Sequence, residues 1–201
     1  MDGNVPATPV TEASHGPLSL DLDTTYYWKI NEVNDADWQG EIWNFTTQEY
    51  LVVEDFESYN DIDPPDPESH TIFGSWLDGY LTPTTNGALV GYSPAQPPSD
   101  PSYMEQTIVY DGYDGDQSMP FSYGNTTAGY SEATVNVADL QVGQDWTKGS
   151  PQTLVLFIHG DVSNAATGQL YVKVGSAKEL YNGDITKPMW RQWNIDLAGL
   201  G

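Results

Sequence analysis

Apolar and polar residues alternate in two short runs near the start of the chain. The apolar members that share a face are Tyr26, Trp28 and Ile30 in the first run, and Trp43 and Phe45 in the second. A period of two residues is typical of half-buried β-strands. Because a polar bend separates the runs, residues 20–45 (LDLDTTYYWKINEVNDADWQGEIWNF) are predicted to form a β-hairpin.

The first run also begins with the spacing of a tyrosine corner, formed by Leu20, Thr24 and Tyr26. In such a corner the tyrosine hydroxyl bonds back to the preceding turn. With these features, LDLDTTYYWKINEVN and GEIWNFTT resemble the last two strands of a fibronectin type III-like domain, of the kind repeated in large secreted proteins of environmental bacteria. The resemblance implies that residues 18–49 are a terminal hairpin of a seven-stranded domain. Residues 1–17, rich in Pro, Thr, Ser and Gly, indicate an extended arm or linker that supplies at most one more strand.

From residue 50 onward the chain consists of short β-favouring runs separated by Gly, Pro, Asn or Asp. The runs are TIFGSW, ALVGY, YMEQTIVY, QSMPFSY, YSEATVNVA, TLVLFIHG, QLYVKV, KELYN and WRQWNIDL. No segment keeps a helical period of 3.6 residues. The pattern predicts an all-β fold, with residues 50–201 forming an antiparallel β-sandwich of the jelly-roll type.

Several separated motifs of this second unit carry a further resemblance. They are EDFE, a loop with Trp and Asp-Gly, QSM after a glycine, YSEAT, HGD and W-x-x-WNIDL. Together they resemble the galactose-binding-like jelly-roll modules, including carbohydrate-binding modules, that occur beside fibronectin-like repeats. Such modules close with further strands that carry an acidic DDI-type sequence, so residues 50–201 are expected to lack their usual last strand.

Both units are therefore expected to be incomplete, which would leave strand edges unpaired. Three explanations stay open. The chain is a fragment, the arm at residues 1–17 fills the vacancy, or a neighbouring chain fills it by strand addition.

The charge of the chain limits its partners. Lys and Arg total 6 against 29 Asp and Glu, a net charge of -23, which disfavours nucleic acid and anionic membrane surfaces. Dense carboxylates favour a divalent cation, and Ca2+ is the expected cofactor.

The chain has no cysteine, so disulfides and thiolate metal sites are excluded. No run approaches 18 apolar residues and no signal peptide is recognisable, so we expect no membrane span and an export signal that is removed or outside this chain.

Candidate calcium ligands fall in two places. Asp111, Asp114 and Asp116 lie in DGYDGD, where glycines let oxygen ligands converge; the loop lacks the terminal Glu of an EF-hand, and a solvated hairpin tip is the alternative. The jelly-roll resemblance implies a structural calcium near the first strand, with Glu57 and Asp55 as its ligands, whereas alternation alone would place both in solvent around a buried Phe56.

A third acidic cluster, Asp61, Asp63, Asp66 and Glu68, stands among prolines and indicates a solvated loop.

Sugar binding requires exposed aromatic rings flanked by polar groups. The candidate rings in or beside expected loops are Trp76, Tyr80, Tyr92, Tyr103 and Tyr113, with Asp78, Asn86 and Gln96 as polar partners. Core or edge packing explains Trp190 and Trp193 better.

Catalytic motifs are missing. His15, His70 and His159 are scattered, no zinc-binding His pair occurs, and no G-x-S-x-G elbow is present. With 29 acidic residues, pairs of carboxylates arise by chance and do not indicate a catalytic site, so a glycosidase or lyase is a distant third hypothesis.

The leading hypothesis is a non-catalytic, calcium-stabilised, secreted or cell-surface β-sandwich protein that binds a glycan or surface polymer. The alternative is a structural subunit of an extracellular filament or surface layer, assembled from identical chains by strand exchange.

Overall fold

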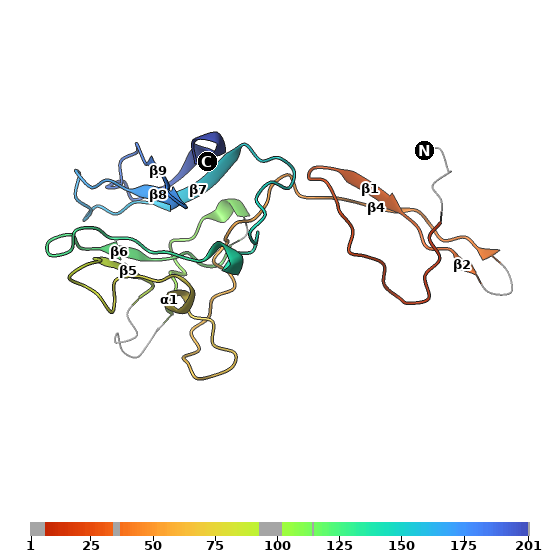
Figure 1. The fold of residues 1–201 in the computed structure, drawn as a ribbon, viewed down its shortest axis with the longest axis horizontal. Coiled ribbons are helices and arrows are strands. Elements are labelled where there is room, and N and C mark those ends of the chain that lie inside the picture. The colour runs from red at the N-terminus through yellow and green to blue at the C-terminus, as the bar shows by residue number, and fades with distance from the viewer. Residues whose placement is uncertain (1–6, 34–36, 93–101, 114, 201) are drawn as a thin grey trace. The chain divides into compact units, whose positions relative to one another are not determined.

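The computed structural model describes residues 7–33, 37–92, 102–113 and 115–200 (Figure 1). The chain divides into two compact units, Met1–Leu51 and Val52–Gly201. Strands account for 25% of the described residues and helices for 7%. The all-β prediction is therefore confirmed. No helix in the described part of the chain is long and apolar enough to cross a membrane.

The first unit contains the predicted hairpin. Strand β1 (Thr25–Trp28) pairs antiparallel with β4 (Trp43–Thr46), and a smaller pair, β2 (Glu32–Val33) with β3 (Asp37–Trp38), extends the ribbon. The register sets Tyr26 opposite Phe45, with ring centroids 5.9 Å apart, and Trp28 opposite Trp43, with centroids 4.7 Å apart. Cross-strand aromatic pairs of this kind stabilise a hairpin by about 0.2–1 kcal/mol each.

The tyrosine corner is also confirmed. The backbone N–H of Asp21 donates to the hydroxyl of Tyr26 at 2.8 Å, and the hydroxyl of Thr47 donates to the carbonyl of Asp21 at 2.6 Å. The turn that precedes β1 is thereby tied to both strands of the hairpin.

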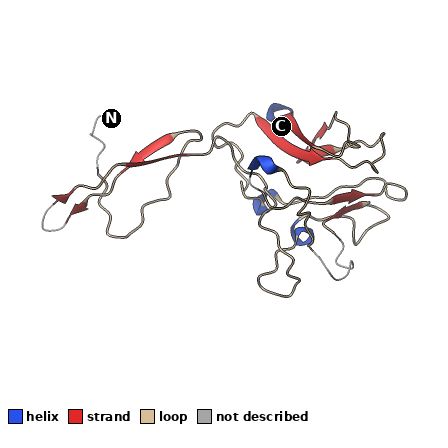
Figure 2. Cartoon of the chain, turned by 180° about the vertical axis from the view of Figure 1, so that it is seen from behind, coloured by secondary structure: helices blue, strands red, loops and turns tan. Residues whose placement is uncertain are grey.

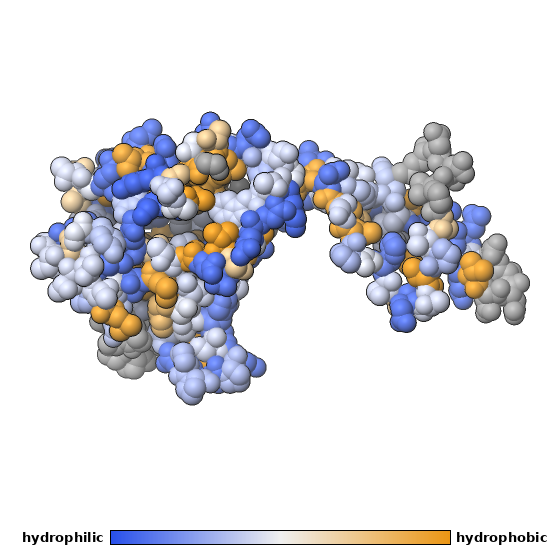
Figure 3. Space-filling model, in the orientation of Figure 1, coloured by the Kyte–Doolittle hydropathy of each residue, from blue (hydrophilic) through white to orange (hydrophobic). Residues whose placement is uncertain are grey.

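Within the described residues of the first unit, no side chain is buried. Trp28 is 43% exposed and Trp38 67% exposed, although both are large aromatic residues. The space-filling view shows apolar patches among polar atoms over this unit (Figure 3). Residues 7–17 are exposed throughout and form no strand. The hairpin therefore has no core of its own, and two-stranded hairpins of this size are marginal in water.

The described residues of the second unit form three antiparallel strand pairs, whose strands can be followed in Figures 1 and 2. They are β5 (Ala88–Val90) with β6 (Phe121–Tyr123), β7 (Thr153–His159) with β10 (Trp190–Asp196), and β8 (Tyr171–Val174) with β9 (Ala177–Leu180). The helical turns are α1 (Ile72–Ser75), η1 (Asp111–Tyr113), η2 (Val137–Asp139) and η3 (Leu197–Gly199). Every sheet in the described part of the chain is two-stranded.

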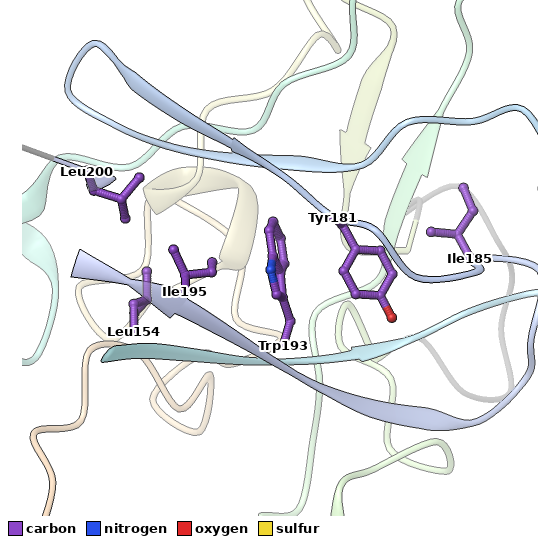
Figure 4. Close-up of a cluster of buried hydrophobic side chains, with 6 residues drawn as sticks. All are labelled: Leu154, Tyr181, Ile185, Trp193, Ile195 and Leu200. Carbon is purple, nitrogen blue, oxygen red and sulfur yellow. The ribbon is translucent and has the colours of Figure 1, made fainter. Parts of the chain in front are cut away.

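One core cluster lies on the inner face of β7 and β10 (Figure 4). Leu154 of β7 is opposite Ile195 of β10, and Trp193 lies two residues earlier on the same face. Tyr181, Ile185 and Leu200 complete the cluster, and the rings of Tyr181 and Trp193 are 5.1 Å apart. Burial of each such side chain contributes about 1.5–3 kcal/mol. The core packing expected for Trp193 is confirmed, since only 7% of it is exposed.

A second cluster is built from Tyr59, Ile72, Val90, Tyr103 and Met104. Here one strand prediction is wrong, because TIFGSW forms the helical turn α1 instead. Thr71 and Ile72 are both buried, at 3% and 0% exposure. Two consecutive buried residues do not fit a half-exposed strand, and the N–H of Trp76 closes the turn on the carbonyl of Ile72 at 2.8 Å.

Residues 103–110 and 130–138, also predicted as strands, form only isolated bridges in the described structure. These bridges join Glu105 to Ser118, Thr134 to Leu77, and Tyr130 to Asn86. For residues 103–110 the reason is local. The carboxylate of Glu105 accepts from the backbone N–H groups of Thr107 and Ile108 at 2.6 and 3.0 Å. Side-chain acceptors that capture neighbouring N–H groups compete with strand ladders.

Candidate functional site

The two predicted calcium-binding segments are in contact. Oε1 of Glu57 accepts from the backbone N–H groups of Asp116 and Gln117, at 3.1 and 3.2 Å. Asp111 begins the turn η1 and is exposed, and Asp116 is exposed as well. Asp114 lies outside the described residues. Glu57 thus joins the first segment to the DGYDGD loop, with N–H groups directed at one of its carboxylate oxygens.

Asp55 has different partners. Its Oδ1 accepts from the side-chain amide of Gln141 at 2.5 Å and from the N–H of Glu57 at 3.0 Å. Phe56, between the two acids, is half-buried against the second core cluster and adopts a φ of 65°, in the left-handed region. Across the described ranges no three His, Asp or Glu side chains converge on one point.

The acidic loop at residues 61–68 anchors a tyrosine. Asp61 accepts from the backbone N–H of Tyr103, and Asp63 from its hydroxyl, both at 2.6 Å. The hydrogen bond to Asp63, together with burial, raises the pKa of Tyr103 to about 12. Only 5% of Tyr103 is exposed. The expectation that Tyr103 offers a free ring to a sugar is therefore wrong. Tyr103 is packed in the second core cluster and hydrogen-bonded to the acidic loop.

The other predicted ligand-binding residues are dispersed. Trp76 packs against Phe56 at 5.9 Å, and its indole N–H donates to the hydroxyl of Tyr59 at 3.1 Å, so its ring is half-buried. Tyr80 is 70% exposed. Next to it, the two carboxylate oxygens of Asp78 accept from the N–H groups of Tyr80 and Val90, both at 2.9 Å. Asp78 therefore holds the backbone of this loop.

Tyr92 is 46% exposed and donates its hydroxyl to Glu105. Burial, and then this hydrogen bond, raises the pKa of Tyr92 to about 12. Asn86 is buried and bonds to backbone groups of Ala88 and Glu132. Gln96 and the side chain of Tyr113 lie outside the described part. Tyr80 and Tyr92 thus remain as exposed rings, on separate segments.

A groove of about 520 Å³ lies elsewhere, between residues 179–183 and residues 190–194 of β10. Residues from both faces of β10 are among those that line it. Its volume falls in the range of small-molecule sites. The sequence analysis did not predict this groove.

The walls of this groove combine aromatic and polar side chains. Trp190 is half-buried, with its ring 5.4 Å from His159 and 5.8 Å from Tyr110. The amide of Gln192 donates to Asn194 at 2.7 Å, and Asn182, Glu179 and Arg191 also line the groove. The signal in the sequence was the alternation of WRQWNIDL, which turns Trp190, Gln192 and Asn194 away from the face that buries Trp193.

A second hollow of similar volume, about 520 Å³, is bounded by His70, Ser75 and Asp139 among others. The Nε2 of His70 is 3.4 Å from the hydroxyl of Ser75, and its Nδ1 is 2.9 Å from the carbonyl of Ser58. The ring of Tyr59 packs on the imidazole at 4.8 Å. These contacts tie His70 to the second core cluster.

Comparisons of this chain with protein-family models, with curated proteins and with solved structures found no match.

Proposed function

We propose that the chain is a non-catalytic module of a secreted or cell-surface protein, and that it binds carbohydrate or a related surface polymer. The observation that carries this proposal is the groove beside β10, which is lined by Trp190 together with Asn182, Gln192 and Asn194. Pyranose rings stack their C–H faces on aromatic rings, while amides and charged groups bond the hydroxyls at their rim. The net charge of -23 makes nucleic acid an unfavourable partner.

In this proposal residues 50–201 are a jelly-roll-type sandwich, and residues 18–49 are the end of a fibronectin-like domain. Structural calcium stabilises the sandwich close to Glu57 and the DGYDGD loop. The hydrogen bonds from Asp116 and Gln117 to Glu57 support this placement, because they bring the two acidic segments together.

A glycan array tests the binding function. The full chain is expected to retain a glycan that the Trp190→Ala variant no longer binds. Trp38→Ala is the matched control, since Trp38 is 67% exposed and belongs to the first unit. Tyr80→Ala and Tyr92→Ala test the loop rings in the same way. Near-ultraviolet circular dichroism checks that each variant is folded. An array with no hit for the folded chain contradicts the proposal.

A second candidate function is supported by a separate observation. The described part of the first unit has no buried residue, and all sheets described are two-stranded. Exposed apolar faces and open strand edges are the features that strand addition between chains uses. The chain would then be a structural subunit of a filament or surface layer, joined to identical chains.

The mass of the native particle in solution distinguishes this candidate. A structural subunit is expected to sediment as large species that become monomers when residues 1–17 are deleted. A monomer at all concentrations, with or without calcium, contradicts assembly and leaves the binding function standing.

A further inference from the structure

Charge is distributed unevenly along the chain. Residues 148–201 hold five of the six basic residues and only four acidic ones, a net charge of +1. The preceding 147 residues carry one lysine and 25 acidic residues, a net charge of -24. The segment that contains the groove beside β10 is therefore the part of the sequence with the smallest excess of negative charge.

Arg191 is the chain's sole arginine and lines this groove. Three of the lysines have partners close by. Lys173 lies 3.1 Å from Glu132, Lys187 lies 3.7 Å from Asp184, and Lys178 lies over the ring of Tyr171. In contrast, Arg191 donates to the sulfur of Met189 at 3.3 Å and forms no ion pair with a carboxylate of the described residues.

This arrangement is unusual in a chain with 29 carboxylates. A guanidinium group presents a planar fork of N–H donors that matches a carboxylate or a sulfate in two parallel hydrogen bonds. A neutral sugar needs only the amides and the aromatic ring that the groove already provides. Arg191 lines the same groove as Trp190 but leaves β10 on the opposite face, the one that carries Trp193. Its guanidinium adds the capacity to recognise a negative charge.

We infer that the ligand of the groove is an anionic glycan, one whose sugars bear carboxylate or sulfate groups. Arg191 binds the acidic group from one face of β10. From the other face, Trp190 contacts the sugar ring, and Gln192 and Asn194 bond its hydroxyls. This inference rests on the proposed binding function and specifies its ligand class. Glu179 lines the opposite wall, and its charge opposes the acidic group of the ligand.

Calorimetric titration of the full chain tests the inference. The probes are polygalacturonate, its fully methyl-esterified form, neutral dextran and dextran sulfate, all measured with a chelator so that calcium cannot bridge two acids. At least one anionic probe is expected to bind about tenfold or more tightly than its neutral counterpart. Preference for polygalacturonate identifies a carboxylate ligand, and preference for dextran sulfate identifies a sulfate ligand.

Variants at the groove assign the effect to its residues. Arg191→Gln is expected to weaken binding of the anionic probe about tenfold without affecting the neutral one, and Arg191→Lys to restore part of the loss. Glu179→Gln is expected to tighten binding. Lys187→Gln is the matched control, since it removes the same charge outside the groove and should change affinity less than twofold.

Equal binding of charged and neutral probes, or anionic binding that Arg191→Gln leaves unchanged, overturns the inference while the binding function stands. Absence of binding to every probe and to the glycan array overturns both.

Discussion

The carboxylate of Glu105 offers a sharp test of how side chains organise the second unit. Its Oε1 accepts from the N–H of Thr107 at 2.6 Å, the N–H of Ile108 at 3.0 Å and the hydroxyl of Thr107, and its Oε2 accepts from the hydroxyl of Tyr92. Burial alone would raise the pKa of Glu105, but these hydrogen bonds outweigh it and lower the pKa from 4.5 to about 2. The ionised carboxylate is therefore favoured by the folded state.

The direction of the pH dependence follows from this shift. A carboxylate whose folded pKa lies below its unfolded value stabilises the fold above the unfolded pKa, and loses that contribution as the pH falls toward the folded one. The difference between 4.5 and about 2 sets an upper limit of about 3.4 kcal/mol. Because Glu105 is partly open to solvent, screening reduces the contribution to about 1–2 kcal/mol.

We expect Glu105→Gln to lower the free energy of unfolding by about 1–2 kcal/mol at pH 7. Urea denaturation of wild type and variant, followed by tryptophan fluorescence at several pH values, measures the difference. It should be constant above pH 4.5 and shrink toward zero as the pH approaches 2. Taking the difference removes the change in repulsion among the other acids, which both chains share.

The control is Glu68→Gln, because Glu68 is exposed. This variant should change stability by less than about 0.5 kcal/mol at every pH. A Glu105→Gln difference that persists at pH 2, or grows on acidification, would refute the hydrogen-bonding account.

Three further variants and one control probe the core and the calcium proposal. Gln117→Ala removes an amide that donates to two carbonyls of the turn at residues 56–59, and thermal unfolding should show a loss of about 1–3 kcal/mol. Trp193→Ala opens a cavity in the first core cluster and should cost about 3–5 kcal/mol in urea denaturation, whereas Trp38→Ala on the exposed hairpin should cost less than about 0.5 kcal/mol. If calcium binds, millimolar Ca2+ should raise the melting temperature and a chelator should reverse the increase. Glu57→Gln should abolish this response. A melting temperature that neither Ca2+ nor the chelator changes contradicts the calcium proposal.

Local periodicity was sufficient to predict several elements. The alternation around Tyr26 and Trp28 predicted the hairpin, and the spacing from Leu20 to Tyr26 predicted the tyrosine corner, because neighbours in sequence decide both. The same holds for β10, whose strand was predicted from the run WRQWNIDL. These features depend on contacts within a strand and its adjoining turn.

Only the tertiary structure decided which polar and aromatic groups meet. Tyr103 is buried because Asp61, 42 positions earlier in the chain, binds its backbone, and Glu57 reaches Asp116 across 59 positions. The groove beside β10 exists because residues 179–183 pack near residues 190–194. Arg191 is notable there because no carboxylate pairs with it among the residues described. Periodicity indicates which face of a strand is apolar, but the partner of a long-range contact depends on how separate loops pack together, which no local pattern contains.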